Sequence, residues 1–411
     1  MGEYRMQRNT DVLVAGGGVG GTMAAIAAAR RGVKVTLVER GGCLGGTWTA
    51  ALVGMTLDGD DKEGLLREFL ALVERERQQG TATVFEIQKY VLEKLCKESG
   101  VEVLFHSQIC GVQTKGRRIT EVKVITKSGM IGFYAQVVID ATGDGAVAAM
   151  AGCSFDYGRA SDGKAQPMSM IALVSGLDAG AKKYISFPDQ PFWDARNRLK
   201  GVLDSVGAPY SIGCPSIQPL YGDIYILSAN QEYGKSGSNV DELTEATMNA
   251  RSEIYRLVRT LRGKAPDVFG NLILVNTPEC IGVREGRRIH GRYTITVDDM
   301  IAGRRHEDAV CLVRYWVDIH SLENDGGKGF TDDGIKMQPY DIPFRALLPE
   351  DIDNLVLAGR CISGDFYAHA SYRVAGNMAP VGEAAGIMAA KSVTEGKQVC
   401  ELEYRMDKTA I

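Results

Sequence analysis

The stretch DVLVAGGGVGGTMAAIAAARRGVKVTLVE, residues 11–39, decides the fold of this chain. Its first five residues form a short apolar run typical of a buried strand, and the alanine-rich run 22–30 is typical of a helix. Apolar residues return at 34–38, which predicts a second strand. A strand, a glycine-rich turn, a helix and a second strand in this order predict the βαβ unit of a dinucleotide-binding domain.

The glycines of this turn match the spacing G-x-G-x-x-G. Gly16 suits the tight turn, Gly18 would let the backbone approach a pyrophosphate, and Gly21 would let the helix pack closely on the strand. Glu39 ends the second strand, where an acid accepts hydrogen bonds from the adenosine ribose. Because such an acid suits a free 2′-hydroxyl, FAD or NAD fits better than NADP.

A second glycine-rich run, RGGCLGGTW, follows Glu39 directly at residues 40–48. An NAD-dependent dehydrogenase does not require it, whereas an extended FAD needs a side-chain-poor bed along its pyrophosphate and ribityl. We therefore expect cofactor contacts from this run (Arg40, Gly45, Gly46 and Thr47). The alternative is a mobile surface loop, although Cys43, Leu44 and Trp48 are poor residues for one.

Two later stretches also read as strands that end at a nucleotide. VVIDATGDG, residues 137–145, predicts cofactor contacts at Ala141, Thr142 and Gly143. LVLAGR, residues 355–360, ends at Gly359 and is followed by Asp365. After it, the run NMAP opens an Ala/Gly-rich helix at 381–390, with proline in its first turn and Asn377 or a neighbour as its cap. The free amides of this helix start, near Asn377 and Met378, would suit an electron-rich ring edge.

The order GGGxGG, E-x-x-G-x-LGGT, VVIDATGDG and LVLAGRCIS…R…GEAAG resembles the FAD-dependent oxidoreductase family of glutathione-reductase-like flavoproteins. Relatives of that family include heterodisulfide reductase flavin subunits, fumarate reductases and thiazole synthases. The blocks IGVREGRRIHGRYTITVDDM, VDIH and YDIPFRALLP look similar as well. The resemblance implies extended FAD, with Glu39 on the adenosine ribose, Asp365 on the ribityl or pyrophosphate, and the helix after Asn377 facing the flavin pyrimidine edge.

The chain also departs from these relatives. It lacks cysteine-rich cluster motifs, a second G-x-G-x-x-G for NAD(P)H, and paired redox cysteines. We predict an α/β fold, with a Rossmann-like FAD-binding domain (a parallel sheet with helices on both faces) and an inserted mixed α+β substrate domain. The expected FAD domain is discontinuous, at 1–152 and 341–411, and the substrate or cap domain is 153–340. Within the insertion, 242–262 has the apolar spacing of a long amphipathic helix.

Composition excludes several classes of partner. The 411 residues carry a formal net charge of -4, which does not favour nucleic acid or an anionic membrane. The longest apolar runs are too short to span a bilayer, and we expect no signal peptide. Nine scattered cysteines without C-x-x-C spacing argue against a metal site and for reduced thiols in the cytoplasm.

Two histidines are candidates for catalysis. His369 lies between Asp365 and the helix after Asn377, where the chain should pass the flavin ring, and Arg373 lies four residues on as an anion-binding group. His320, in the VDIH block, has Asp318 as an orienting partner. For each imidazole the alternative is a hydrogen-bonded structural role.

A basic run, 284–292, contains Arg288 as a further candidate for the substrate pocket, with a solvated or salt-bridged face as the alternative. Cys43 raises a covalent thioether to flavin as a minor alternative. The sequence thus predicts an FAD-dependent oxidoreductase that transfers a hydride between a small polar substrate and the flavin. A fumarate-reductase-like ene-reductase, an electron-relay subunit and a thiazole-synthase-like protein are the alternatives. A redox partner or a homo-oligomer also stays open.

Overall fold

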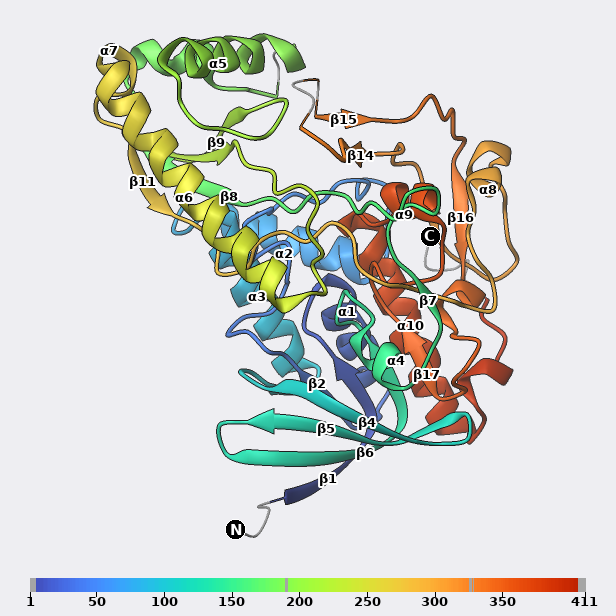
Figure 1. Ribbon diagram of the computed structural model, residues 1–411. Coiled ribbons are helices and arrows are strands. Elements are labelled where there is room, and N and C mark those ends of the chain that lie inside the picture. The colour runs from blue at the N-terminus through green and yellow to red at the C-terminus, as the bar shows by residue number, and fades with distance from the viewer. Residues whose placement is uncertain (1–4, 189–190, 325–326, 328, 406–411) are drawn as a thin grey trace.

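A computed structural model describes residues 5–188, 191–324, 327 and 329–405 (Figure 1). Within these residues the largest sheet has seven strands in the order β3-β2-β1-β6-β5-β4, and β17 pairs with β6. The strands are β1 (Arg5–Ala15), β2 (Val35–Val38), β3 (Glu102–Leu104), β4 (Gln108–Lys115), β5 (Arg118–Thr126), β6 (Gly129–Asp140) and β17 (Leu355–Leu357). β3, β2, β1, β6 and β17 run parallel, which confirms the Rossmann-like sheet.

The pairing of the sheet changes from parallel to antiparallel along β6. The first residues of β6 pair with antiparallel β5, and its last residues pair with parallel β17. The strand expected from residue 137 is the last part of β6, which begins earlier, at Gly129. β1 pairs with β6 from Arg5 to Ala15 and holds this longer strand extended.

Helices cover this sheet and contact one another through glycines. They are α1 (Val19–Ala29), α2 (Leu65–Arg77), α3 (Val84–Glu98), α4 (Ala146–Met150) and α10 (Ala375–Glu395). A Cβ at Gly382 of α10 would lie 2.0 Å from the Gly20 carbonyl oxygen of α1, and one at Gly386 would lie 2.1 Å from that of Ala24. Only glycine permits such an approach, so α1 and α10 pack backbone to backbone (Figure 1).

The expected start of α10 is wrong. The helix begins at Ala375, and Pro380 lies inside it rather than in a first turn that Asn377 caps. A contact from elsewhere in the chain explains the early start, because the Gly376 amide donates to the Leu57 carbonyl at 3.0 Å and needs no side-chain cap.

A second sheet has the antiparallel order β11-β8-β10-β9. Its elements are β8 (Ile171–Ser175), β9 (Ser216–Tyr221), β10 (Ile224–Ser228), β11 (Ile273–Asn276), α5 (Phe192–Val206), α6 (Val240–Lys264), α7 (Pro266–Phe269) and the 3-10 helix η1 (Ala179–Tyr184). The long amphipathic helix is confirmed as α6, whose buried stripe includes Ala250, Ile254 and Leu257. This stripe packs into a second hydrophobic core with Met170 and Val174.

Short elements fill the rest of the described chain. They are β7 (Phe155–Asp156), β12 (Arg288–Ile289), α8 (Val297–Ala302), β13 (Ala309–Val313), β14 (Ile319–His320), β15 (Phe330–Thr331), β16 (Tyr340–Pro343), η2 (Phe344–Leu347), α9 (Phe366–Tyr372) and η3 (Val399–Glu401). The buried residues Ile289, Val310 and Ile319 belong to the first hydrophobic core. The domain boundaries at 152/153 and 340/341 stay a prediction. In the described part of the chain, no helix has the length and apolar character needed to cross a membrane.

Candidate functional site

The first glycine loop joins β1 to α1, and its glycines serve different needs. Gly16 has a φ of +100°, and a Cβ there would lie 2.5 Å from the Ala141 carbonyl oxygen. A Cβ at Gly21 would lie 1.9 Å from the Gly16 carbonyl oxygen. At Gly18, by contrast, a Cβ would meet nothing within 4 Å. The fold itself therefore requires Gly16 and Gly21, whereas Gly18 faces space that a ligand can use.

The second glycine loop, residues 41–48, lies directly against the first. The Gly45 amide donates to the Gly17 carbonyl at 2.8 Å, and Gly45 and Gly18 form an isolated parallel bridge. A Cβ at Gly46 would lie 3.0 Å from the Gly18 Cα. The two loops therefore form one surface of backbone atoms, as the second glycine run led us to expect.

Apolar side chains anchor the second glycine loop. Leu44 and Trp48 are fully buried, and the Trp48 ring stacks on Phe69 with a centroid distance of 4.7 Å. This anchoring argues against a mobile surface loop. Thr47 and Arg40 have exposed side chains, and their contacts with a cofactor stay predictions.

Glu39 connects the two loops. Its Oε2 accepts from the Gly17 amide at 2.7 Å, and its Oε1 accepts from the Gly41 amide at 2.6 Å. The carboxylate therefore fixes both glycine loops in position, and each oxygen keeps a further lone pair for a ribose hydroxyl. The predicted contact with the ribose is compatible with this arrangement and stays a prediction.

A buried carboxyl shapes the loop after β6. Asp140 accepts from the Thr142 hydroxyl at 2.7 Å and from the Ala148 amide at 2.8 Å. Burial raises the pKa of Asp140, and these hydrogen bonds oppose the shift. The loop continues through Gly143, with a φ of +80°, and lies beside the loop of Gly359, where a Cβ would meet nothing within 4 Å. Gly359 thus leaves a second open position next to the first glycine loop.

Asp365 and Asn377 stand at the starts of α9 and α10. Both Asp365 oxygens accept from amides, at 2.8 Å from Ala368 and at 2.7 Å from Val297. The Asn377 side-chain oxygen accepts from the Cys311 thiol at 3.4 Å, but its Nδ2 has no hydrogen-bond partner in the described part of the chain. Asn377 is fully buried, and its Nδ2 is therefore a donor that a ligand could satisfy.

The polar cluster, which we define as Gln166, Arg284, Asp318, His320 and Arg373, lies near α9. Arg373 donates to the Asp318 carbonyl at 2.8 Å and to the Gln166 Oε1 at 3.2 Å. The His320 amide donates to the same Gln166 oxygen at 3.1 Å. The structure therefore brings together His320, Asp318 and Arg373, which the sequence singled out separately.

Burial and charge set the protonation of this cluster. Burial and the nearby Arg284 lower the pKa of His320 to about 4, although Asp318 opposes the shift. Burial alone would raise the pKa of Asp318, but His320, Arg373 and Arg284 hold it below its usual range. Burial and the like charge of Arg373 lower the pKa of Arg284 to about 10. At neutral pH the cluster thus contains two guanidinium groups, one carboxylate and a neutral imidazole.

The paired glycine loops, the open positions at Gly18 and Gly359, and the free amide of Asn377 fit a long ligand with phosphates and a polar ring. The sequence model described as FAD dependent oxidoreductase matches residues 11–409. The chain belongs to this family. FAD is therefore its cofactor and the protein is an oxidoreductase, as the motifs predicted. The cofactor-binding residues named from the sequence stay predictions.

Several solved structures are similar to this chain over most of its length. A geranylgeranyl bacteriochlorophyll reductase-like protein from Thermoplasma acidophilum is 14% identical with a TM-score of 0.44, covering 95% of this chain and 79% of that chain. The p-nitrophenol 4-monooxygenase PnpA from Pseudomonas putida is 11% identical with a TM-score of 0.48, covering 97% and 83%. The flavin-dependent brominase Bmp2 is 14% identical with a TM-score of 0.46, covering 97% and 81%.

At these identities and scores, the likeness carries no argument about substrate. No curated protein matches the sequence. The FAD-dependent oxidoreductase family is confirmed, whereas none of these three structures is a glutathione-reductase-like relative of the kind that the sequence resembles. The finer resemblance therefore stays a prediction.

His320 is oriented in this FAD enzyme by a neighbour from the second sheet. The Gln231 Nε2 lies 2.8 Å from the His320 Nδ1, and the Tyr233 hydroxyl donates to the Gln231 Oε1 at 2.6 Å. Because an amide nitrogen can only donate, Nδ1 accepts, and the neutral ring carries its proton on Nε2. That Nε2 lies 3.6 Å from the Asp318 Oδ2, longer than a normal hydrogen bond. The Nε2–H therefore faces the Asp318 carboxylate through a long contact.

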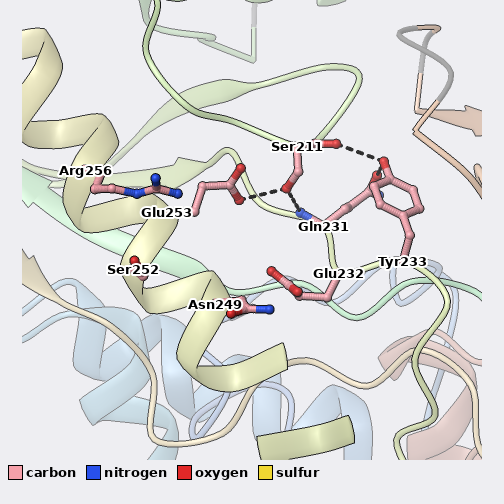
Figure 2. A pocket seen from close by; sticks show the side chains of 8 residues that line it. All are labelled: Ser211, Gln231, Glu232, Tyr233, Asn249, Ser252, Glu253 and Arg256. Carbon is pink, nitrogen blue, oxygen red and sulfur yellow. Dashed lines mark hydrogen bonds between the residues drawn. The ribbon is translucent and has the colours of Figure 1, made fainter. Parts of the chain in front are cut away.

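A polar pocket of about 380 Å³ lies on the other side of Gln231 (Figure 2). Figure 2 shows the Ser211 hydroxyl between Glu253 of α6, to which it donates at 2.8 Å, and the Gln231 backbone N–H, from which it accepts at 2.7 Å. Burial raises the pKa of Glu253, and its hydrogen bonds with Asn230 and Ser211 oppose the shift. At this pocket, the Ser211 hydroxyl thus holds the backbone of Gln231 by a hydrogen bond.

His369 and Arg288 have different surroundings. His369 is fully buried in α9, and neither ring nitrogen has a hydrogen-bond partner of normal geometry among the described residues. Burial, followed by the charges of Arg288, Arg373 and Arg360, lowers its pKa well below the usual value, so its ring is neutral. All Arg288 nitrogens donate to protein acceptors, including Glu285 at 2.6 Å. The catalytic roles of both residues stay predictions, and the polar cluster is more accessible than either.

Sequence reasoning did not single out Gln166, Gln231 or Tyr233. Gln166 and Gln231 are isolated glutamines outside any motif, so no local signal identifies them. Only the fold brings Gln166 and Gln231 within hydrogen-bonding distance of His320, and Tyr233 within reach of Gln231.

Proposed function

We propose that this FAD-dependent oxidoreductase transfers a hydride between the flavin and a small polar substrate, with a substrate oxygen held in the polar cluster. One observation carries the proposal. In the cluster, the His320 Nε2 has only the Asp318 Oδ2 as an acceptor, at 3.6 Å, and no acceptor within the described chain serves the Arg373 Nε and the Gln166 Nε2. The last two are buried atoms, for which an unmade hydrogen bond is costly. A ligand oxygen would satisfy these donors.

Each residue has a role in this proposal. Arg373 supplies positive charge and hydrogen bonds to a carboxylate or carbonyl oxygen. His320 donates through Nε2, while Gln231 holds the ring by Nδ1. Asp318 keeps Arg373 in place through contacts at its carbonyl and carboxylate. Bound FAD supplies the hydride chemistry.

The same donors favour a second candidate, an ene-reductase of the kind that fumarate reductases represent. With a pKa of about 4, His320 is almost entirely neutral at pH 7, and its accepting nitrogen is occupied by Gln231. It is therefore a donor rather than a base. Reduction of an activated alkene adds a hydride to one carbon and a proton to its neighbour. After the hydride has been added and before the proton arrives, negative charge develops on the conjugated oxygen. Cationic and neutral donors at that oxygen would stabilise this charge.

Flavin spectroscopy tests both candidates. The purified protein should show a flavin spectrum, and acid precipitation should release FAD into the supernatant rather than leave it attached to Cys43. Anaerobic mixing with alcohols or amines should bleach the flavin if the enzyme oxidises them. Conversely, unsaturated acids should reoxidise photoreduced flavin if it is an ene-reductase.

An Arg373→Ala variant that keeps FAD should lose either reaction. If neither substrate class changes the flavin in the wild-type protein, while an added redox protein does, the electron-relay alternative replaces the proposal. A protein that holds an adenine dinucleotide without flavin redox chemistry would instead support the thiazole-synthase-like alternative.

A further inference from the structure

Four aromatic side chains gather at one place on the molecule. This ring cluster consists of Phe192 and Trp193 at the start of α5, Trp316 just before β14, and Phe330 in β15. Trp193 stacks on Phe330 with centroids 5.7 Å apart and planes 12° apart. Trp316 meets Phe330 edge-on at 5.5 Å, and Phe192 meets both Trp193 and Phe330 edge-on.

The ring cluster adjoins the polar cluster. Phe330 is the direct partner of His320 in the β14–β15 ladder, so their side chains emerge on the same face of the ribbon. Trp316 is two residues from Asp318, and its ring lies 6.0 Å from Tyr315, whose hydroxyl reaches the Asp318 Oδ2 at 3.5 Å. A ligand held at the polar cluster can therefore reach the rings.

The rings keep considerable exposure for such large apolar side chains. Phe192 is 51% exposed and Trp316 is 40% exposed. The Arg196 guanidinium lies 4.1 Å from the Phe192 ring, although its Nε is buried without a hydrogen-bond partner in the described chain. An exposed group of stacked rings beside a cation is suited to a planar π-system that carries negative charge.

The net charge of the polar cluster also favours a ligand that carries negative charge. Arg284 and Arg373 carry two positive charges, Asp318 carries one negative charge, and His320 is neutral. Arg288, the next cation along, is already paired with Glu285 at 2.6 Å. Within the largely buried polar cluster, one positive charge is therefore left over, which the single negative charge of a carboxylate held there would balance.

We propose that the substrate is a planar aromatic or conjugated monocarboxylate, with its carboxylate at the polar cluster and its flat body against the ring cluster. This inference rests on the proposed function and narrows its substrate class. A second copy of the chain or another protein could also cover exposed rings, but neither would account for the unbalanced positive charge beside them.

Binding calorimetry on the FAD-loaded protein tests the inference with probes of equal charge. 2-Naphthoate and benzoate present flat rings, whereas cyclohexanecarboxylate has the carbon count of benzoate without its planarity. We expect binding in the order 2-naphthoate, benzoate, cyclohexanecarboxylate. We also expect Trp316→Leu and Phe192→Leu to weaken 2-naphthoate binding by about 3- to 10-fold each, the range of one aromatic contact.

Phe155→Leu is the matched control. Phe155 is 42% exposed and has its own arginine, Arg287, 5.2 Å from the ring, but lies outside the ring cluster in β7. This variant should bind 2-naphthoate as the wild-type protein does. A second readout is tryptophan fluorescence, which 2-naphthoate should quench in the wild-type protein and less in Trp316→Leu.

Equal affinity for cyclohexanecarboxylate and benzoate, or naphthoate binding that ignores both ring variants, would overturn the inference. So would a dimer that the Phe192 and Trp316 variants dissociate, because the rings would then be covered by a second copy. Failure of the proposed function looks different: the aromatic acids would bind with the expected preference, yet no conjugated acid, alcohol or amine would change the flavin's redox state.

Discussion

The two glycine loops and the polar cluster lie in one molecule but contact their ligands in different ways. The loops present backbone atoms, fixed by the carboxylate of Glu39 and by glycines that lie against neighbouring backbone. The polar cluster presents the side chains of residues scattered from Gln166 to Arg373, two of them with a buried donor that has no partner among the described residues. A backbone site tolerates no added side chain, whereas a side-chain site depends on charge and hydrogen bonding. Substitutions should therefore affect the two sites in different ways.

The largest effect is expected at Gly18. Its backbone is extended, and a Cβ would meet no protein atom within 4 Å, so Gly18→Val should fold normally. The new side chain would occupy ligand space, and FAD binding should be abolished. The flavin absorbance per protein measures FAD binding, and the melting temperature of the apoprotein measures whether the variant folds normally. Gly201→Val, at an equally open position in α5, should keep FAD. FAD retention by Gly18→Val would refute the backbone interpretation.

In the polar cluster, Arg373→Ala should retain FAD and lower kcat/KM by roughly 100-fold or more, since it removes a buried charge partner of the substrate. Arg373→Lys should recover only part of this loss, because an ammonium lacks the planar fork. Steady-state kinetics on the substrate found by flavin screening provide the measurement. Arg67→Ala, an exposed arginine of α2, serves as the control. Equal loss of FAD in Arg373→Ala would remove the distinction between the two sites.

The two candidate histidines, His320 in the polar cluster and His369 in α9, can be tested separately. His320→Ala should lower kcat by about 100-fold with FAD retained, because a positioned donor is lost. His369→Ala should also keep FAD and lose most turnover, as the sequence predicted. Rapid-mixing measurements of flavin reduction or reoxidation would decide between them. Should only His320→Ala be impaired, His369 has a structural role; wild-type rates in both would exclude imidazole chemistry.

Acid should destabilise the polar cluster before the glycine loops. The folded-state pKa of His320 is about 4, below its ordinary 6.5, so the unfolded chain binds a proton first as pH falls. Stability is therefore complete above pH 6.5 and declines toward pH 4, by up to about 3 kcal/mol. Asp318, whose pKa is also lowered, adds a further loss below its ordinary value of 3.8.

Denaturant unfolding between pH 7 and 4 measures this decline. His320→Gln should show a shallower dependence on pH than the wild-type protein. An unchanged slope in His320→Gln would contradict the buried, neutral state of His320.

The smallest effect is expected at Tyr233, which contacts His320 through Gln231. Tyr233→Phe removes the hydroxyl that orients the Gln231 amide, so His320 should lose part of its fixed tautomer. We expect kcat to fall by about 3- to 10-fold with little change in KM, in line with one neutral hydrogen bond. A change in KM alone would indicate that Tyr233 contacts substrate directly. The kcat-pH profile should also shift in this variant.

The sequence predicted the loops well because each motif is local. Gly16 to Glu39 lie on one βαβ unit, and the close approach of Gly21 to the Gly16 carbonyl lies within that unit, although Gly16 itself also lies against Ala141 after β6. The polar cluster was predicted only in part. Asp318 and His320 share a block, but Gln166 and Gln231 reach them through the folding of two sheets. The early start of α10 was missed for the same reason, since the Leu57 carbonyl replaces the expected cap.

The dependence of the first strands on the last part of the chain has a consequence for biosynthesis. β17 pairs with β6, and α10 packs on the backbone of α1, yet both are translated more than 200 residues after their partners. On the ribosome, the nascent amino-terminal half must wait with the apolar face of α1 uncovered until α10 has been translated. A release of the chain before residue 355 would leave that face exposed, and such a fragment should depend on chaperones for solubility.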